Sequence, residues 1–243
     1  MAWGTFGAAH IISLILAVVL NVGVYYILKK HSPKVQVAVL GILSLWGIGA
    51  IIFNLITAEL IIEYLPLHLC SFGAMVLPIT VLTRNKVLSN LTLLWALGAA
   101  MALIVNHSIA HAKIGGLIFC FYYFPHVFEA GIPILLFKLG LCKLDSKCIF
   151  STIGISAALY TAVHLFNATV NSYCLEHELV DYTGRIIDIN YMYSVMPDNP
   201  LLDLFYSWIP KPFWYMLPAI PIVAIYLGAI YGIDALIKRR KKT

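Results

Sequence analysis

Residues 5–28 read TFGAAHIISLILAVVLNVGVYYIL, an unbroken apolar stretch that is followed directly by two lysines. An α-helix needs about 20 apolar residues to cross the hydrocarbon core of a bilayer. No basic region precedes this stretch and no small-residue cleavage site follows it, which is unlike a signal peptide. The stretch therefore predicts a helix that stays in the membrane.

Six further apolar stretches follow along the chain. Their apolar residues run continuously and do not alternate with polar ones, which favours helices over membrane-spanning strands. The sequence thus predicts an all-α membrane protein, a seven-transmembrane-helix bundle that forms a single domain over residues 1–243. The predicted spans cover residues 5–28, 35–57, 66–82, 87–105, 116–138, 148–171 and 213–237, with a long outer loop over residues 172–212.

The composition of the whole chain points to the same class. Of 243 residues, 61% are hydrophobic and 11% are charged, and the mean hydropathy is +0.90. A soluble domain carries about 25% charged residues, and an intrinsically disordered chain combines low hydrophobicity with high charge. Both classes are therefore excluded. The net charge of +5 is explained by membrane topology, and nucleic acid is not an expected partner.

Lysine and arginine are distributed unevenly over the loops. Of the 16 lysine and arginine residues, 13 fall on one side of a seven-span chain. The three exceptions are Lys113, Arg185 and Lys211. Cytoplasmic loops of membrane proteins carry the excess of these residues. The pattern predicts an external N-terminus, a cytoplasmic C-terminus and a multi-pass protein of the cell membrane. The cations of the cytoplasmic side are Lys29, Lys30, Lys34, Arg84, Lys86, Lys138, Lys143, Lys147 and the five residues 238–242.

The long outer loop contains a helix signal of its own. Asn199-Pro200 precedes the stretch LLDLFYSWI at residues 201–209. Asn is a favoured N-cap residue, and Pro fits the first helical turn. Because aromatic residues are enriched at the membrane interface, we expect a short interfacial helix here. It would serve as an anchor or, alternatively, as a lid or lipid-entry ramp.

The five cysteines show no spacing typical of a zinc or thioredoxin site. The sequence also lacks the motifs of P-loops, serine hydrolases and HExxH metalloproteases. No metal and no cofactor are therefore expected. Two of the cysteines, Cys120 and Cys174, lie toward the outer side, where they could form a disulfide. The other three are Cys70, Cys142 and Cys148.

Polar side chains gather in the outer halves of the predicted spans, and polar groups inside a membrane mark functional sites by default. His126 and Glu129 are three residues apart, as are His164 and Asn167, so each pair shares one helix face. A glutamate in spans without lysine or arginine has to pair with a histidine or stay protonated. The remaining members of the set are Asn54, His68, Cys70 and Asn171.

Cys70 has the most specific surroundings of these residues. With Pro66 in the first helical turn, Cys70 lies about one turn into the third helix, where the helix dipole favours a thiolate. Such a thiolate can attack an acyl ester if a base assists it, and His126 is the candidate base, oriented by Glu129 or an asparagine. Counting along straight helices puts Cys70 roughly 6 Å and His126 roughly 12–16 Å below their helix starts, so a tilt or a kink at Pro125 has to bring them together.

Three short motifs resemble one family. They are LPLHLC at residues 65–70, His126 in the Phe-rich middle of the fifth span, and NYM at residues 190–192. On these motifs the chain resembles the YwaF family of bacterial integral membrane proteins, which is related to animal transmembrane protein 164. The resemblance implies acyl transfer between membrane lipids, with Cys70 as nucleophile, His126 as acid/base and residues 190 and 191 in the pocket. The supporting or substrate-binding residues of the expected site are then His68, Glu129, His164, Asn167, Asn190 and Tyr191.

Two other functions fit the same polar cluster. A transporter or receptor would use the His and Glu side chains to bind a proton, an ion or a small ligand. A scaffold would use them only for hydrogen bonds between helices. The inverted repeats typical of many transporters are not visible in the sequence, and the oligomeric state stays open.

Overall fold

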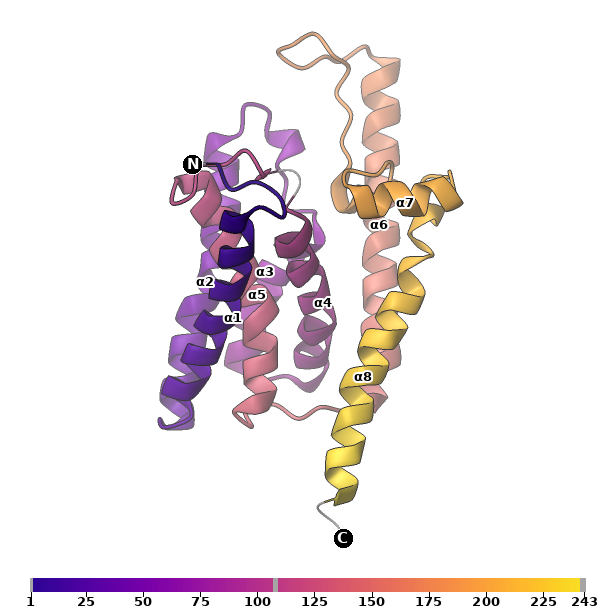
Figure 1. Ribbon diagram of the computed structural model, residues 1–243. Helices are drawn as coiled ribbons and strands as arrows, with labels where there is room; N and C mark the ends of the chain where they lie inside the picture. Colours follow the sequence, from indigo (N-terminus) through magenta and orange to yellow (C-terminus); the bar gives the residue numbers. More distant parts are fainter. Residues whose placement is uncertain (1, 107–108, 241–243) are drawn as a thin grey trace.

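The computed structural model describes residues 2–106 and 109–240, and these ranges are helical apart from loops and two isolated β-bridges. Six of the described helices are long and apolar enough to cross a membrane, which confirms an all-α, multi-pass membrane protein. Figure 1 shows α1 to α5 gathered in one bundle, with α6 and α8 beside it. The six helices are α1 (Ala8–Leu28), α2 (Pro33–Thr57), α4 (Lys86–Val105), α5 (Leu117–Lys138), α6 (Ile149–Glu176) and α8 (Ala219–Arg240).

A further apolar helix, α3 (Leu69–Thr83), is shorter than these six. Its 15 residues span about 22 Å, which is less than the roughly 30 Å of a hydrocarbon core. The predicted helix start at Pro66 is wrong, because His68 has an extended backbone (φ −77°, ψ 155°) and is the N-cap residue. Cys70 is therefore the second residue of α3 and does not lie one turn inside it.

Two boundaries of the outer loop also differ from the prediction. α6 continues past residue 171 to Glu176, and its 28 residues span about 42 Å, so it projects beyond the other helices (Figure 1). α8 begins at Ala219 and not at residue 213, because Phe213 has a left-handed φ of 65° and is followed by the 3₁₀ turn η5 (Trp214–Met216).

The short helix expected in the outer loop is present as α7 (Pro200–Trp208). Asn199 is its N-cap, and the Asn199 Oδ1 atom accepts a hydrogen bond from the Leu202 N–H at 3.2 Å. Leu202 and Phe205 are buried, whereas Leu204 and Trp208 are exposed. Figure 1 shows α7 lying crosswise to α6 and α8, the orientation that a helix in a membrane interface adopts.

α5 is the central helix of the bundle. It lies against α1, α2, α3 and α4, and completely buried side chains such as Val127 and Ile132 join it to a common core. α6 and α8 contact the bundle through α4. There the Trp95 Nε1–H donates to the Ser156 Oγ atom at 2.9 Å, and Leu227 of α8 packs on α4 residues.

The loops that carry the clustered cations lie together. The Trp3 N–H donates to the Ala112 carbonyl at 2.9 Å, so the chain start and the α4–α5 connection share one end of the molecule, which we call the N-terminal end. α1, α3 and α5 run parallel from this end. The α1–α2, α3–α4 and α5–α6 connections and the last turn of α8 lie at the opposite end (Figure 1), which we call the basic end.

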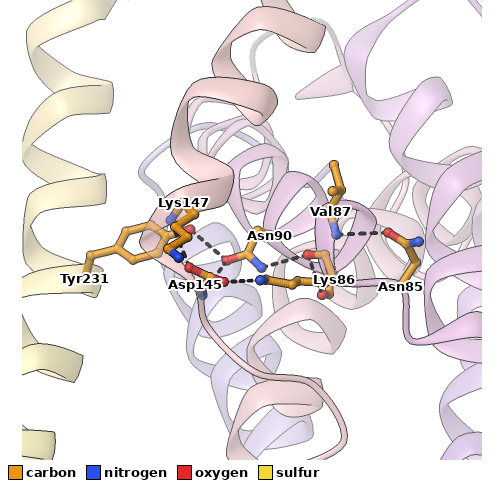
Figure 2. Close-up of polar contacts among 8 residues, drawn as sticks. Asn85, Lys86, Val87, Asn90, Asp145, Lys147 and Tyr231 are labelled. Carbon is orange, nitrogen blue, oxygen red and sulfur yellow. Dashed lines mark hydrogen bonds and ion pairs between the residues drawn. The ribbon is translucent and has the colours of Figure 1, made fainter.

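A polar cluster ties α8 to α4 at the basic end (Figure 2). The Asn90 Oδ1 atom of α4 accepts hydrogen bonds from the Tyr231 hydroxyl of α8 at 2.7 Å and from the Asp145 N–H at 3.3 Å. The Asn90 Nδ2 atom donates to the Lys86 carbonyl at 2.8 Å. The Asp145 carboxylate forms an ion pair with the Lys86 ammonium. The cluster therefore joins the start of α4, the α5–α6 connection and α8.

The ion pair predicts a pH dependence of stability. The pKa of Asp145 is below its ordinary value, because the carboxylate accepts hydrogen bonds from the Lys86 side chain and the Lys147 N–H. A carboxyl with a lowered pKa stabilises the fold above its unfolded pKa, and the contribution is lost as the pH falls through the folded pKa. We expect Asp145→Asn to lower the Tm at neutral pH, and we expect this difference to shrink as the pH falls below about 4 and through the lowered pKa of Asp145. Thermal unfolding in detergent across pH measures this, and a Tm difference that stays constant into acid would contradict it.

Candidate functional site

Cys70 lies on the face of α3 that packs inside the bundle. Gly73 and Ala74, one turn further along the helix, share this face and are buried. Cys70 is half-buried and its thiol is hydrogen-bonded to Ser71. The thiol also interacts electrostatically with Glu129 of α5. Cys70 therefore points toward α5 and not toward lipid.

Glu129 is 7% exposed and lies between three helices. A methyl group on Gly73 of α3 would lie 3.6 Å from the Glu129 Oε2 atom, and one on Gly47 of α2 would lie 3.2 Å from the Oε1 atom. A methyl group on Gly47 would also approach the Ala74 Cβ atom to 2.6 Å, closer than carbon atoms pack. The missing side chain of Gly47 thus makes room for Ala74 and for the carboxyl, whereas Gly73 borders the carboxyl at ordinary contact distance.

The contact between Gly73 and Glu129 sets the register of α3 and α5. The two helices are parallel. Toward the N-terminal end, Cys70 lies one turn from Gly73, and His126 lies one turn from Glu129. Residues three positions apart lie on the same helix face. His126, which is 7% exposed, is therefore on the turn of α5 that faces the turn of α3 with Cys70.

This register accounts for the difference in depth between Cys70 and His126 that was expected from counting residues along straight helices. Glu129 lies about 18 Å from the start of α5 at Leu117, whereas Gly73 lies about 6 Å from the start of α3 at Leu69. Since these two residues are adjacent, α3 begins about 12 Å deeper than α5. The expected tilt or kink at Pro125 is not needed to bring the two turns level.

The hydrogen bond of His126 defines its proton positions. The Nδ1 atom is 2.7 Å from the Tyr122 carbonyl, which can only accept, so Nδ1 carries the ring proton. The neutral ring then has an unprotonated Nε2 atom, the form that acts as a base. The Tyr122 ring lies over the imidazole with centroids 4.3 Å apart, and the Tyr122 hydroxyl donates to the Ala102 carbonyl at 2.9 Å. These contacts fix the imidazole in the bundle.

His68 joins α3 to the outer loop and makes a supporting contact. Its Nδ1 atom accepts a hydrogen bond from the Met192 N–H at 3.3 Å. Its ring lies 5.3 Å from the rings of both Tyr191 and Tyr193. His68 thus binds residues 187–198, a segment that we call the strap. The Nδ1 atom of His68 is thus engaged by the strap.

Tyr191 is a large, almost completely buried side chain of the strap, with 1% exposure. Its hydroxyl accepts from the Leu65 N–H at 3.0 Å and donates to the Ile62 carbonyl. The motifs at residues 65–70 and 190–192 are therefore in direct contact, although they are far apart in the sequence.

α6 holds the strap from the other side. The Asn167 Nδ2 atom donates to the Tyr191 carbonyl at 2.8 Å and to the Ser194 Oγ atom at 2.9 Å, and its Oδ1 atom accepts from the Tyr191 N–H at 3.3 Å. The His164 Nδ1 atom is 3.1 Å from the same Ser194 hydroxyl. The structure thus brings His164 and Asn167 together, and it uses both to position the strap.

Two further asparagines shape the strap. The Asn190 Oδ1 atom accepts from the Val195 N–H at 3.0 Å and from the Met196 N–H at 3.3 Å, which folds the strap onto itself. Asn171 of α6 bonds both the N–H and the carbonyl of Ile189, at 2.8 and 2.9 Å. Both asparagines thus hold the backbone of the strap.

Two residues near Cys70, Tyr122 and Tyr193, are not among the predicted set, and neither is Asp198, the hydrogen-bond partner of Tyr193. Tyr122 and Tyr193 interact electrostatically with Cys70, and the Tyr193 hydroxyl is hydrogen-bonded to Asp198. Burial raises the pKa of Tyr193 above its ordinary value. Met192 and Tyr193 have left-handed backbones with φ of 53° and 52°, a strain typical of functional sites. Tyr122 is one turn from the predicted His126, and Tyr193 directly follows the NYM motif. Both tyrosines could therefore have been identified from their positions in the sequence.

Asn167→Ala is expected to release the strap from α6. The substitution leaves the buried N–H and carbonyl of Tyr191 without their side-chain partner, which costs about 1–3 kcal/mol for an unsatisfied group. Hydrogen exchange followed by mass spectrometry should show faster exchange in residues 187–198. Thr161→Ala is the control, because the exposed Thr161 hydroxyl bonds only within α6. Unchanged exchange in the strap of Asn167→Ala would contradict this role.

The chemistry available to the site is that of a thiol, an imidazole, a carboxyl and two phenols. Within residues 2–106 and 109–240, no group of three or more His, Cys, Asp and Glu side chains could hold a metal ion. All five cysteines, including Cys120 and Cys174, are free thiols.

Comparison with known proteins gives one match. A model of the TMEM164 family matches residues 5–231, which is nearly the whole chain. Neither the curated proteins nor the solved structures contain a match. The family match confirms the relation to transmembrane protein 164 that the three motifs implied. The chain belongs to the TMEM164 family.

Proposed function

We propose that the chain is an acyltransferase embedded in the cell membrane, which moves a fatty acyl chain between lipids. Cys70 is the nucleophile and His126 is the acid/base. The observation that supports this proposal is the contact of Gly73 with Glu129, one helical turn from Cys70 and His126 respectively, together with the His126 hydrogen bond that leaves the Nε2 atom unprotonated. A nucleophile beside a base that a third group orients is the arrangement that covalent catalysis requires.

In the first half-reaction, the His126 Nε2 atom takes the proton of the Cys70 thiol. The sulfur then attacks the carbonyl carbon of an acyl ester in the donor lipid, and a C–S bond forms. The C–O bond to the glycerol oxygen breaks, and this oxygen takes the proton from His126. The products are a lysolipid and an acyl thioester on Cys70.

In the second half-reaction, an acceptor lipid brings a free hydroxyl to the thioester. His126 removes the hydroxyl proton while the oxygen attacks the thioester carbon. The C–S bond breaks, and the Cys70 sulfur takes the proton back from His126. The acyl chain is thereby transferred without a cofactor, because the energy of the donor ester is conserved in the thioester and then in the product ester.

The direct test is an exchange assay with purified protein in vesicles. The vesicles contain phosphatidylcholine with an isotope-labelled acyl chain and an unlabelled lysophospholipid as acceptor. We expect a labelled two-chain lipid from the acceptor and, from the donor, a lysophosphatidylcholine that has lost the labelled chain. Absence both of this product and of any protein-bound acyl chain would overturn the proposal.

We also propose that α3 is a seventh span, with the N-terminal end outside and the basic end in the cytoplasm. The cation-rich loops at one end of the bundle support this orientation. A reporter fused after Thr243 should be cytoplasmic, and one inserted near Glu178 should be external. Location of both reporters on the same side would contradict the seven-span topology.

The burial of Glu129 among α2, α3 and α5 favours a second candidate function, a transporter or receptor that binds a proton or a small ligand. Proteoliposomes with an enclosed pH dye distinguish the two. Proton flux that is lost in Glu129→Gln would support this second function. Acyl transfer by protein that carries no proton flux would exclude proton transport.

A further inference from the structure

A groove of about 780 Å³ opens between α1, α4 and α5, on a face of α5 that does not carry His126 or Glu129. Its floor contains small residues, among them Ala17, Ala130 and Gly131. Val22 and Ile134 form part of its walls and are 47% and 46% exposed. Because these helices cross the membrane, the groove faces the acyl chains of the bilayer.

The groove follows the length of α1. Leu14 and Leu103 line it near the N-terminal end, and Tyr25, Tyr26 and Lys138 line it near the basic end. Along α1 the distance from residue 14 to residue 26 is about 18 Å. A long, narrow and apolar shape of this size suits a single extended acyl chain.

The rim at the basic end carries positive charge. Lys138 is an exposed lining residue at the last turn of α5. The Lys29 Nζ atom lies 4.1 Å from the centroid of the Tyr26 ring, which also lines the groove. This cation–π contact holds the ammonium at the rim. None of the described residues that line the groove is acidic.

We propose that this groove is a binding site for an anionic glycerophospholipid of the leaflet at the basic end. One acyl chain lies between α1 and α5, and the phosphate lies at Lys138 and Lys29. Juxtamembrane lysines attract anionic lipid headgroups in this way. A second copy of the chain fits the groove less well, because a two-fold interface at this face brings the same lysines together.

The site is separate from Cys70, so the proposal holds whether or not the chain transfers acyl groups. The test uses purified protein in phosphatidylcholine nanodiscs with a trace of phosphatidylglycerol that has a diazirine in one acyl chain. After irradiation, mass spectrometry locates the cross-links. We expect them to concentrate on residues 18–22 of α1 and residues 130–134 of α5, and we expect the matching photoreactive phosphatidylcholine to label these residues less.

Two pairs of variants sharpen the test. Lys138→Gln should lower labelling by phosphatidylglycerol about five-fold, whereas Lys143→Gln, an equal change of charge in the neighbouring loop, should leave it unchanged. Val22→Trp should block the groove, and Val19→Trp, at an exposed position outside it, should not. Cross-links spread evenly over the exposed helix faces, or equal labelling of all four variants, would overturn the proposal. Equal labelling by the two lipids would overturn its anionic part.

Discussion

Cys70→Ser is expected to reduce acyl transfer to the background rate while the protein stays folded. A serine hydroxyl is a poor nucleophile unless it is strongly activated, whereas a thiol beside a base is a good one. The two side chains are similar in size, and the thiol of Cys70 is hydrogen-bonded to Ser71, a contact that a hydroxyl can keep. The free energy of unfolding should therefore change by less than about 1 kcal/mol. Exchange of labelled acyl chains and thermal unfolding measure the two quantities.

Cys120→Ser is the matched control for this variant. Cys120 is a half-buried free thiol of α5, as Cys70 is of α3. The two substitutions remove the same atom from similar surroundings, but only Cys70 is level with His126. Loss of activity in both variants would indicate a general effect on the fold. Transfer at the native rate by Cys70→Ser would show that the nucleophile is assigned wrongly.

His126→Gln is expected to lower acyl transfer by about 10²–10⁴-fold, the usual contribution of a general acid/base. Glutamine retains hydrogen-bonding capacity, so the contact with the Tyr122 carbonyl can be kept, but glutamine cannot carry a proton between sulfur and oxygen. We therefore expect a large loss of activity with a small change in Tm. The pH dependence of the residual rate should also become flat near neutrality.

His10→Gln should give the opposite result. His10 is completely buried, accepts a hydrogen bond from the Phe6 N–H and bonds the Leu103 carbonyl at 2.8 Å. It connects α1 to α4 and lies away from the strap, so its substitution should lower the Tm and leave the rate per folded molecule unchanged. If His126→Gln behaves like His10→Gln, the intramembrane histidines only hold helices together.

Much of the fold follows from local properties of the sequence. Apolar length predicts six of the membrane helices, and the Asn199-Pro200 cap predicts α7. The start of α3 was predicted wrongly at Pro66, because proline in the first turn is a local preference. The extended backbone of His68 belongs instead to a contact with Met192, which is distant in the sequence.

The candidate site was predictable in its residue types but not in its geometry. Intramembrane polarity selects Cys70, His126 and Glu129 without any structure. Their arrangement depends on contacts between helices, among them the close approach of α2 to Ala74 of α3, which the missing side chain of Gly47 allows. The contacts that Asn167 and His68 make with the strap are likewise long-range, so they could not be derived from neighbours in the chain.

The central claim is that the acyl chain passes through a covalent bond to Cys70. Purified protein, incubated with a phosphatidylcholine that has a labelled acyl chain and no acceptor, is digested and analysed by mass spectrometry. We predict that the peptide with Cys70 gains the mass of the acyl chain, that hydroxylamine removes it, and that the adduct accumulates more slowly in His126→Gln. An acyl-exchange activity without any adduct on Cys70, or an adduct on Cys120 instead, would contradict the mechanism.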